Sequence, residues 1–173
     1  MVLAADLSVA TAEIGRRLKA GGTLFACGNG GSMADALHLV GEMVGRFAYD
    51  RPAMRAVTLA CNPSSVTAIA NDFSYRDALL READALVGSG DALVAISTSG
   101  NAANVCDAAA LARGRGAFVL GLSGRGGGRL ASVCDIPLVV PSDATPRIQE
   151  VHITLIHALC ELLEEEMHPR ETG

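Results

Sequence analysis

Short runs of consecutive apolar residues alternate along the chain with longer stretches in which apolar residues recur every three or four positions. A short continuous run predicts a strand buried on both faces, and the wider spacing predicts a helix with one buried face. The predicted strands cover residues 23–27, 56–60, 92–97, 117–122 and 136–140. The predicted helices cover residues from about 5 to 19, 32–45, 77–87, 101–113, 127–132 and from about 147 to 167. This alternation predicts an α/β fold with a central five-stranded parallel sheet covered by helices on both faces.

The 173 residues are half hydrophobic and only 3% aromatic, which suits one compact domain with an aliphatic core. No Pro-rich or Ser-rich linker and no internal repeat divides the chain, so we predict a single domain over residues 1–173. The first and last helices carry more apolar residues than one small sheet needs, which predicts that both make oligomer contacts. The residues concerned are Leu3, Leu7, Ile14, Leu155, Leu159 and Leu162.

The net charge is −5, and acidic and basic residues are interspersed except in the acidic tail of residues 164–166. A nucleic-acid surface needs a basic stripe, so the sequence predicts no nucleic-acid partner. A small anionic substrate remains compatible, because it needs only a local site.

Five scattered cysteines without a Cys-x-x-Cys pair indicate neither a disulfide framework nor a zinc ribbon, and they suit a reducing cytoplasm. The start of the chain lacks a basic segment followed by an apolar core, and no run of about eighteen apolar residues occurs. We therefore expect a cytoplasmic protein with no secretory signal and no membrane span.

A glycine-rich loop, Cys27-Gly-Asn-Gly-Gly-Ser32, follows the first predicted strand, at the end where ligands bind in parallel sheets. Its glycines permit close backbone approach, and Ser32 with Asp35 three residues later resembles a helix start. The spacing does not give the G-x-G-x-x-G pattern of dinucleotide-binding proteins, so a redox enzyme is the least favoured class. The alternative is a tight strand-to-helix turn without a ligand.

A second loop, Ser97-Thr-Ser-Gly-Asn101, follows the third predicted strand and opens a helix. Its three hydroxyls, with free backbone N–H groups at a positive helix end, suit a phosphate. The loop lacks the Gly-Lys-Ser/Thr of a nucleoside triphosphate site, so a monophosphate on a small metabolite is the better interpretation. A hydroxyl-rich helix cap is the structural alternative.

Metal-capable side chains occur in two predicted helices. His38 and Glu42 are four residues apart and share a helix face, and Gln149 and His157 lie in the last helix. Taken singly, each would be an ordinary helix residue, but together they offer two imidazoles, a carboxylate and an amide.

These segments together resemble the sugar isomerase (SIS) domains and, within them, the phosphoheptose isomerase family. The resemblance extends over nearly the whole chain. It is carried by Cys-Gly-Asn-Gly-Gly-Ser at 27–32, Ala-x-His-x-x-x-Glu at 36–42, Gly-Arg-Phe at 45–47, Asn-Asp-Phe at 71–73, Ile-Ser-Thr-Ser-Gly-Asn at 96–101 and Arg-Ile-Gln-Glu-x-His-Ile-x-x-Ile-His at 147–157.

The resemblance implies a flavodoxin-like three-layer α/β sandwich, a homotetramer with sites at subunit interfaces, and one zinc ion per site held by His38, Glu42, Gln149 and His157. It also implies interconversion of sedoheptulose 7-phosphate and D-glycero-D-manno-heptose 7-phosphate, a step in making the heptose of bacterial surface polysaccharides. The implied substrate contacts are Asn29, Gly30, Gly31, Ser32, Glu42, Asn71, Asp72, Ser97, Thr98, Ser99 and Gln149.

The residues suit this reaction independently. Moving a carbonyl between neighbouring carbons requires proton removal and delivery, so we assign Glu42 and His157 as the acid/base pair acting through a cis-enediol. A zinc-bound carboxylate is a poorer base, so either substrate displaces Glu42 from the metal or the metal is not needed in every turnover.

Geometry raises a difficulty for one metal site. On one continuous helix, Gln149 and His157 would lie about 12 Å apart along the axis and differ by roughly 80° in direction. We hypothesise that Gln149 lies at an irregular helix start, or that the two residues reach one ion from different subunits.

Two departures from the family pattern affect substrate contacts. Ala102 stands where a phosphate-binding serine is common, and Pro146 stands near where some members have an aspartate. The alternative functions are a phosphosugar isomerase for another chain length and a noncatalytic SIS module that binds a phosphosugar or a protein, like the DnaA initiator-associating protein. That protein departs at the positions of Glu42 and His157, so their presence here favours the enzyme.

Overall fold

The structure is a computed structural model that describes residues 2–170. Its helices are α1 (Val2–Lys19), α2 (Gly31–Val44), α3 (Pro63–Asp72), α4 (Tyr75–Leu86), α5 (Ala103–Gly114), α6 (Leu130–Val133) and α7 (Thr145–Met167). Its strands are β1 (Leu24–Cys27), β2 (Ala56–Thr58), β3 (Ala92–Ser97), β4 (Phe118–Ser123) and β5 (Ile136–Val139). All five strands are parallel in the order β2-β1-β3-β4-β5, which confirms the predicted α/β class and the flavodoxin-like strand order.

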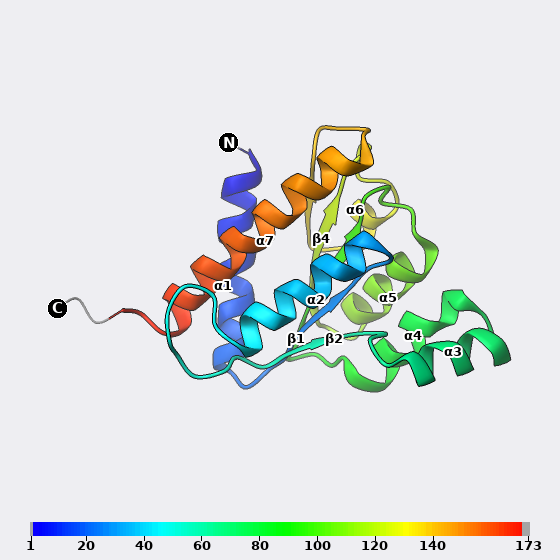
Figure 1. The fold of residues 1–173 in the computed structure, drawn as a ribbon, viewed down its shortest axis with the longest axis horizontal. Coiled ribbons are helices and arrows are strands. Elements are labelled where there is room, and N and C mark those ends of the chain that lie inside the picture. The colour runs from blue at the N-terminus through cyan, green and yellow to red at the C-terminus, as the bar shows by residue number, and fades with distance from the viewer. Residues whose placement is uncertain (1, 171–173) are drawn as a thin grey trace.

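The sheet has one hydrophobic core on each face, so the molecule has three layers. Alternate residues of β1 show the division: Leu24 and Ala26 pack with α1, α2 and α7, whereas Phe25 and Cys27 pack with α4 and α5. Figure 1 shows these two groups of helices on opposite sides of the sheet. Burial on both faces explains why β1, β3 and β4 read as continuous apolar runs.

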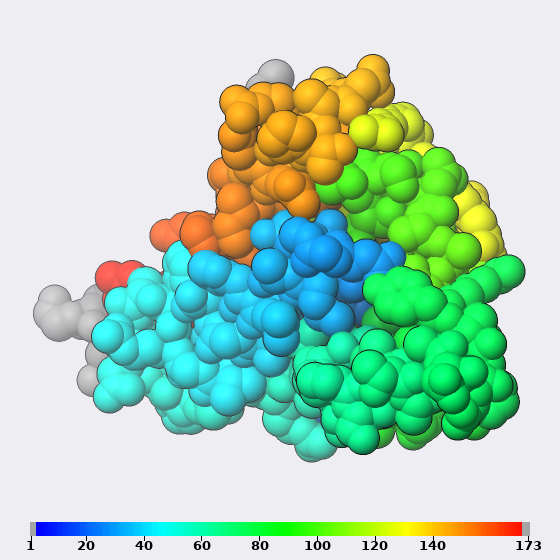
Figure 2. Space-filling view, turned by 45° about the vertical axis from the view of Figure 1, so that its right-hand side comes forward, coloured from blue at the N-terminus to red at the C-terminus, as the bar shows by residue number. Residues whose placement is uncertain are grey.

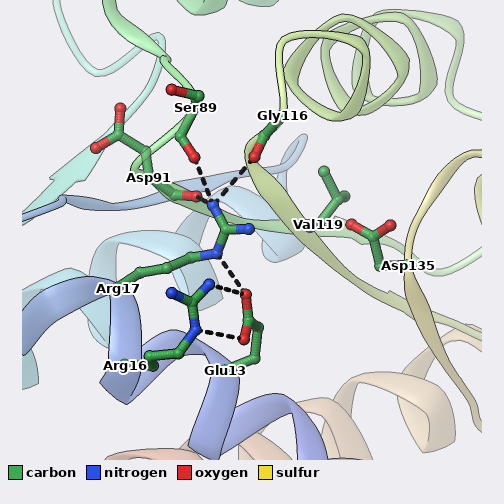
Figure 3. A network of polar contacts seen from close by, with 8 residues as sticks. All are labelled: Glu13, Arg16, Arg17, Ser89, Asp91, Gly116, Val119 and Asp135. Atoms are coloured by element: carbon green, nitrogen blue, oxygen red, sulfur yellow. Dashed lines mark hydrogen bonds and ion pairs between the residues drawn. The ribbon is translucent and has the colours of Figure 1, made fainter. Parts of the chain in front are cut away.

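Arg17 joins helix α1 to the amino-terminal end of the central strands, which is the end opposite the loops after β1 and β3. Its Nη1 donates to the carbonyl oxygens of Ser89, Asp91 and Gly116, at 2.8, 2.9 and 3.1 Å, in the turns before β3 and β4. Glu13 accepts a hydrogen bond from Arg17 Nε at 2.8 Å (Figure 3). One guanidinium therefore connects the first helix to two strands of the sheet.

The prediction missed α3. Asn62 caps this helix by accepting from Ser64 N, and Pro63 occupies the first turn, where its missing N–H costs no hydrogen bond. No residue of α3 is buried, but Val66, Ile69 and Ala70 form a short apolar stripe on its half-buried face. This stripe and the Asn-Pro pair before it were the available signals.

The predicted helix over residues 32–45 is confirmed as α2, but Ser32 is not the capping residue that its spacing from Asp35 indicated. The N-cap position is Gly30, with φ +56°, and Ser32 lies inside α2 with 4% of its surface exposed. A residue with a β-carbon is strained at that φ, so glycine sets where the helix begins.

The apolar residues assigned to oligomer contacts lie mostly in the protomer's own core. Leu7, Ile14, Leu155 and Leu159 pack in the core beneath α1 and α7, and Leu159 is 1% exposed. Of that group, Leu162 is exposed at 43%. Our expectation that these faces exceed the needs of one sheet was therefore wrong for Leu159, because α1 and α7 cover each other as well as the sheet. Within residues 2–170, no helix is long and apolar enough to cross a membrane.

Candidate active site

The two loops singled out in the sequence follow adjacent strands. Strands β1 and β3 are neighbours, with Cys27 opposite Ala95. The chain leaves β1 toward β2 on one side and leaves β3 toward β4 on the other. This is the point of an open α/β sheet where ligands bind beyond the strand ends. Figure 2 shows the starts of α2 (blue), α5 (green) and α7 (orange) meeting in the middle of one face.

The glycine-rich loop is tightly packed. A β-carbon on Gly28 would lie 2.5 Å from the carbonyl oxygen of Ser32, so this position accepts only glycine without movement. The α2 N-terminus has no side-chain cap. Its first N–H groups lie at the positive end of the helix dipole, which suits an anionic ligand.

Asn29 connects this loop to the start of α5. Its side-chain amide exchanges two hydrogen bonds with the amide of Asn104, at 2.8 and 2.9 Å. The hydroxyl of Tyr75, at the start of α4, also donates to Asn29 Oδ1 at 3.0 Å. Sequence reasoning missed Asn104 and Tyr75, because nothing in their local sequence separates them from ordinary helix-start residues.

Two hydroxyls of the second loop, those of Ser97 and Ser99, accept hydrogen bonds from the backbone of the same segment. Ser99 Oγ accepts from Asn101 N at 3.1 Å, and Ser97 Oγ accepts from Ala102 N at 3.4 Å. Gly100 has φ +65°, and a β-carbon there would lie 2.0 Å from the carbonyl oxygen of Gly127. The loop is therefore fixed from both sides.

Helix α5 has no side-chain cap at Ala102. Val105 N donates to Asn104 Oδ1 at 3.0 Å, whereas the N–H groups of Ala103 and Asn104 are left to water or to a ligand, at an end that attracts negative charge. This arrangement is compatible with phosphate binding by Ser97, Thr98 and Ser99, although position 102 is alanine and not serine.

Helices α2 and α7 bring three of the four metal-type residues together. His38 Nε2 lies 3.2 Å from His157 Nε2, and 3.2 Å from Glu42 Oε1. The two rings have centroids 5.1 Å apart, and the ring of Phe47 lies 5.6 Å from that of His157. The side chain of His38 is 43% exposed and that of Glu42 is 27% exposed, so a substrate can reach the cluster from solvent.

Gln149 lies elsewhere on α7. Its Nε2 would be 2.2 Å from a β-carbon on Gly31, so the amide packs on the first residue of α2. His38 is about 10 Å farther along α2. The helix is continuous from Thr145, so the hypothesis that Gln149 lies at an irregular start is wrong.

Asn71 and Asp72 end α3 and are exposed. Asn71 Nδ2 donates to Asp72 Oδ1 at 2.8 Å. Among the hydrogen bonds of residues 2–170, none joins either side chain to the two loops. The nearest residue in sequence that contacts the two loops is Tyr75, which donates to Asn29.

Asp35 lies one turn before His38. Its Oδ2 is buried and has no partner among the described residues, and burial raises the pKa of this carboxyl, against the opposing effect of His38. Asp35 is thus not the capping partner that its spacing from Ser32 indicated.

Comparison with known proteins gives a consistent result. The SIS domain family profile matches residues 3–124. The phosphoheptose isomerase of Trichlorobacter lovleyi is 47% identical over 165 residues, which cover 93% of this chain and 84% of that protein. The phosphoheptose isomerase of Citrifermentans bemidjiense is 50% identical over 149 residues, covering 86% of this chain and 78% of that protein. Among solved structures, phosphoheptose isomerase from Neisseria gonorrhoeae matches with a TM-score of 0.89 and 41% identity, over 95% of this chain and 88% of that one.

Proposed function

Because this chain belongs to the SIS domain family and, within it, to the phosphoheptose isomerases, we propose that it is an aldose-ketose isomerase converting sedoheptulose 7-phosphate to D-glycero-D-manno-heptose 7-phosphate. The observation that carries the proposal is the cluster of His38, Glu42 and His157 beside two loops suited to a phosphate. The cluster can move protons, and the loops can hold the distant end of a sugar phosphate.

The reaction is internal to the sugar and needs no outside oxidant or reductant. A base removes the proton from C1 while the oxygen on C2 gains a proton, which gives the enediol. The O1 proton then leaves and C2 receives a proton, which gives the aldose. Glu42 and His157 supply the base and the acid, because a carboxylate can accept the proton from carbon and an imidazole can deliver one.

The contact between the two imidazoles restricts their protonation. Only one of the facing nitrogens, His38 Nε2 and His157 Nε2, can donate in a hydrogen bond of 3.2 Å. One ring nitrogen therefore accepts the hydrogen bond, and through this contact His38 orients the ring of His157.

We also propose zinc as a cofactor, held by His38, Glu42, Gln149 and His157. Two ligands of one tetrahedral zinc ion lie about 3.3 Å apart, and His38 Nε2 lies 3.2 Å from both His157 Nε2 and Glu42 Oε1. As they stand, no three His, Cys, Asp or Glu side chains of residues 2–170 are grouped to hold a metal ion, and Gln149 packs on Gly31. Three residues thus suit zinc after small side-chain rotations, and the fourth ligand requires a larger movement or a second copy of the chain. When bound, zinc would polarise the sugar oxygens.

We further propose that the protein assembles as a homotetramer, works in the cytoplasm and supplies heptose for lipopolysaccharide. Exposed apolar residues on α2 support self-association, because Leu37 and Val44 are 48% and 49% exposed on the helix that carries the cluster. A site on such a face would be completed by the neighbouring copy.

The test is turnover of sedoheptulose 7-phosphate by purified protein, with and without zinc. We expect activity in the intact protein and its loss, by at least a hundredfold, in Glu42→Gln and in His157→Ala. His168→Ala, in the C-terminal segment, is the matched histidine control and should retain activity. Binding of the sugar without turnover in the metal-loaded protein would instead support the noncatalytic module.

A further inference from the structure

Glu164, near the end of α7, is a fully buried carboxylate with three donors. Phe47 N and Arg51 Nε donate to its Oε1 at 3.0 and 2.9 Å, and Ala48 N donates to Oε2 at 2.8 Å. The side chains of Glu164 and Arg51 are each 1% exposed. Burial alone raises the pKa of Glu164, but the hydrogen bonds from Ala48, Phe47 and Arg51 outweigh it and hold this pKa below its usual value. The sequence had assigned this residue to an acidic tail.

Arg51 connects Glu164 to the helix that carries Glu42. Arg51 Nη2 donates to the backbone oxygen of Glu42 at 2.7 Å, and Nη1 donates to that of Met43 at 2.9 Å. These oxygens belong to the last turn of α2, where carbonyls lack helical partners and favour a cation. One planar guanidinium thus holds the turn of Glu42 against the end of α7.

Phe47 connects Glu164 to His157. Its backbone N–H is fixed by the Glu164 carboxylate, and its ring centroid lies 5.6 Å from that of His157, tilted by 43°. Glu164 is itself about two turns after His157 on α7. The same carboxylate therefore sets the position of a ring that packs on the proposed acid/base histidine.

We propose that Glu164 and Arg51, together the Glu164–Arg51 clamp, are positioning residues that hold Glu42 and His157 in reacting geometry. The assignment rests on the proposed function, because it gives the clamp a role relative to these two residues. A buried ion pair contributes little net stability compared with apolar packing of the same volume. A contribution to folding stability therefore does not explain why Glu164 and Arg51 are paired here. Its hydrogen bonds, in contrast, end on the loop and the helix turn that place the acid/base pair.

The test uses Arg51→Lys and Glu164→Gln, with Glu161→Gln as the matched control on an exposed position of α7. Lysine keeps the charge but cannot reach the oxygens of Glu164, Glu42 and Met43 with a planar fork. We expect kcat to fall about tenfold or more, because small displacements of reacting groups cost large factors in rate. KM should stay within about threefold, because the loop at Ser97–Ser99 is untouched. Phe47→Leu, which leaves the clamp intact, should lower kcat as well.

A second readout is independent of turnover. In ¹³C-histidine-labelled protein, the His157 ring signal should shift in both clamp variants, because the aromatic ring of Phe47 moves relative to it. Folded variants with wild-type kcat and an unshifted His157 signal would overturn the proposal. If the clamp variants do not fold, Phe47→Leu decides, and wild-type kcat in that variant would overturn it. Absence of turnover in wild-type and Glu161→Gln protein would contradict the proposed function, while the His157 signal would still test the positioning.

Discussion

The side-chain amides of Asn29 and Asn104 hydrogen-bond to each other in both directions, although 75 residues separate them in the sequence. Each amide uses its oxygen and its nitrogen, so the pair fixes the orientation of both groups. The glycine-rich loop after β1 is thereby joined to the first turn of α5, and the two loops of the proposed phosphate site are held together.

Asn104→Ala should consequently weaken substrate binding more than the chemical step. Asn104 is 5% exposed, and losing its bonds leaves Asn29 without those partners at a cost of about 1–3 kcal/mol. We expect KM for the sugar phosphate to rise about tenfold with a smaller change in kcat, measured by steady-state kinetics. Tyr75→Phe, which removes one bond to Asn29, should give a smaller increase. Equal KM values for Asn104→Ala and wild-type protein would contradict the assigned role.

Gly31→Ala should act on Gln149 without harming the fold. Alanine favours a helix over glycine by about 1 kcal/mol, but the added carbon would lie 2.2 Å from Gln149 Nε2. We expect thermal stability to be unchanged or higher, and kcat/KM to fall to the level of Gln149→Ala. Gly114→Ala on α5 is the control, because no atom lies within 4 Å of its added carbon. Full activity in Gly31→Ala would show that Gln149 has no role in its observed position.

Stability in acid should depend on Glu13. Hydrogen bonding by Arg16 and then Arg17 outweighs burial and lowers the pKa of Glu13 from 4.5 to about 2. A carboxyl with a lowered folded pKa stabilises the protein above the unfolded pKa, and this contribution is lost as the pH falls from 4.5 toward about 2. Glu13→Gln should lower Tm by about 2–4 °C at neutral pH, with the difference shrinking in that acid range. Thermal unfolding followed by circular dichroism would measure this, and a difference that stays constant with pH would contradict it.

Assembly should depend on the outer face of α2. Leu37→Glu places a charge on a residue that is 48% exposed beside His38, and we expect smaller oligomers by light scattering together with at least a tenfold loss of activity. Leu86→Glu, at a 54% exposed position on α4, should change neither. Leu159→Glu would not be a selective test of assembly, because Leu159 belongs to the protomer's own core. If Leu37→Glu leaves the oligomer unchanged, the interface does not involve this face of α2.

The sequence predicted those parts of the molecule that local pattern controls. The buried strands read directly as apolar runs, and the four-residue spacing of His38 and Glu42 placed both on one helix face, as the structure confirms. The separation of Gln149 from His157 along α7 was also anticipated from helix geometry. The meeting of α2 with α7 depends on tertiary packing, so the contact of His157 with His38 followed only from the family resemblance.

The errors have a shared physical cause. Glu164 was read as part of a solvated charge run, because its neighbours Glu165 and Glu166 are acidic and its donors lie more than a hundred residues away. Asn104 and Tyr75 were missed for the same reason, since their partner is distant in sequence. A buried polar group is identified by its partners, and a single sequence does not display them.

The length of α2 has a consequence for substrate choice. The glycine-rich loop lies at its first residue, whereas His38 and Glu42 lie about two and three turns later, roughly 10 and 16 Å along the axis. A sugar phosphate must extend over that interval to place its phosphate in the loops and its first two carbons beside the imidazoles. In the proposed site, a three- or four-carbon sugar phosphate is too short to reach both ends, so the length of this helix itself selects substrates by the number of their carbons.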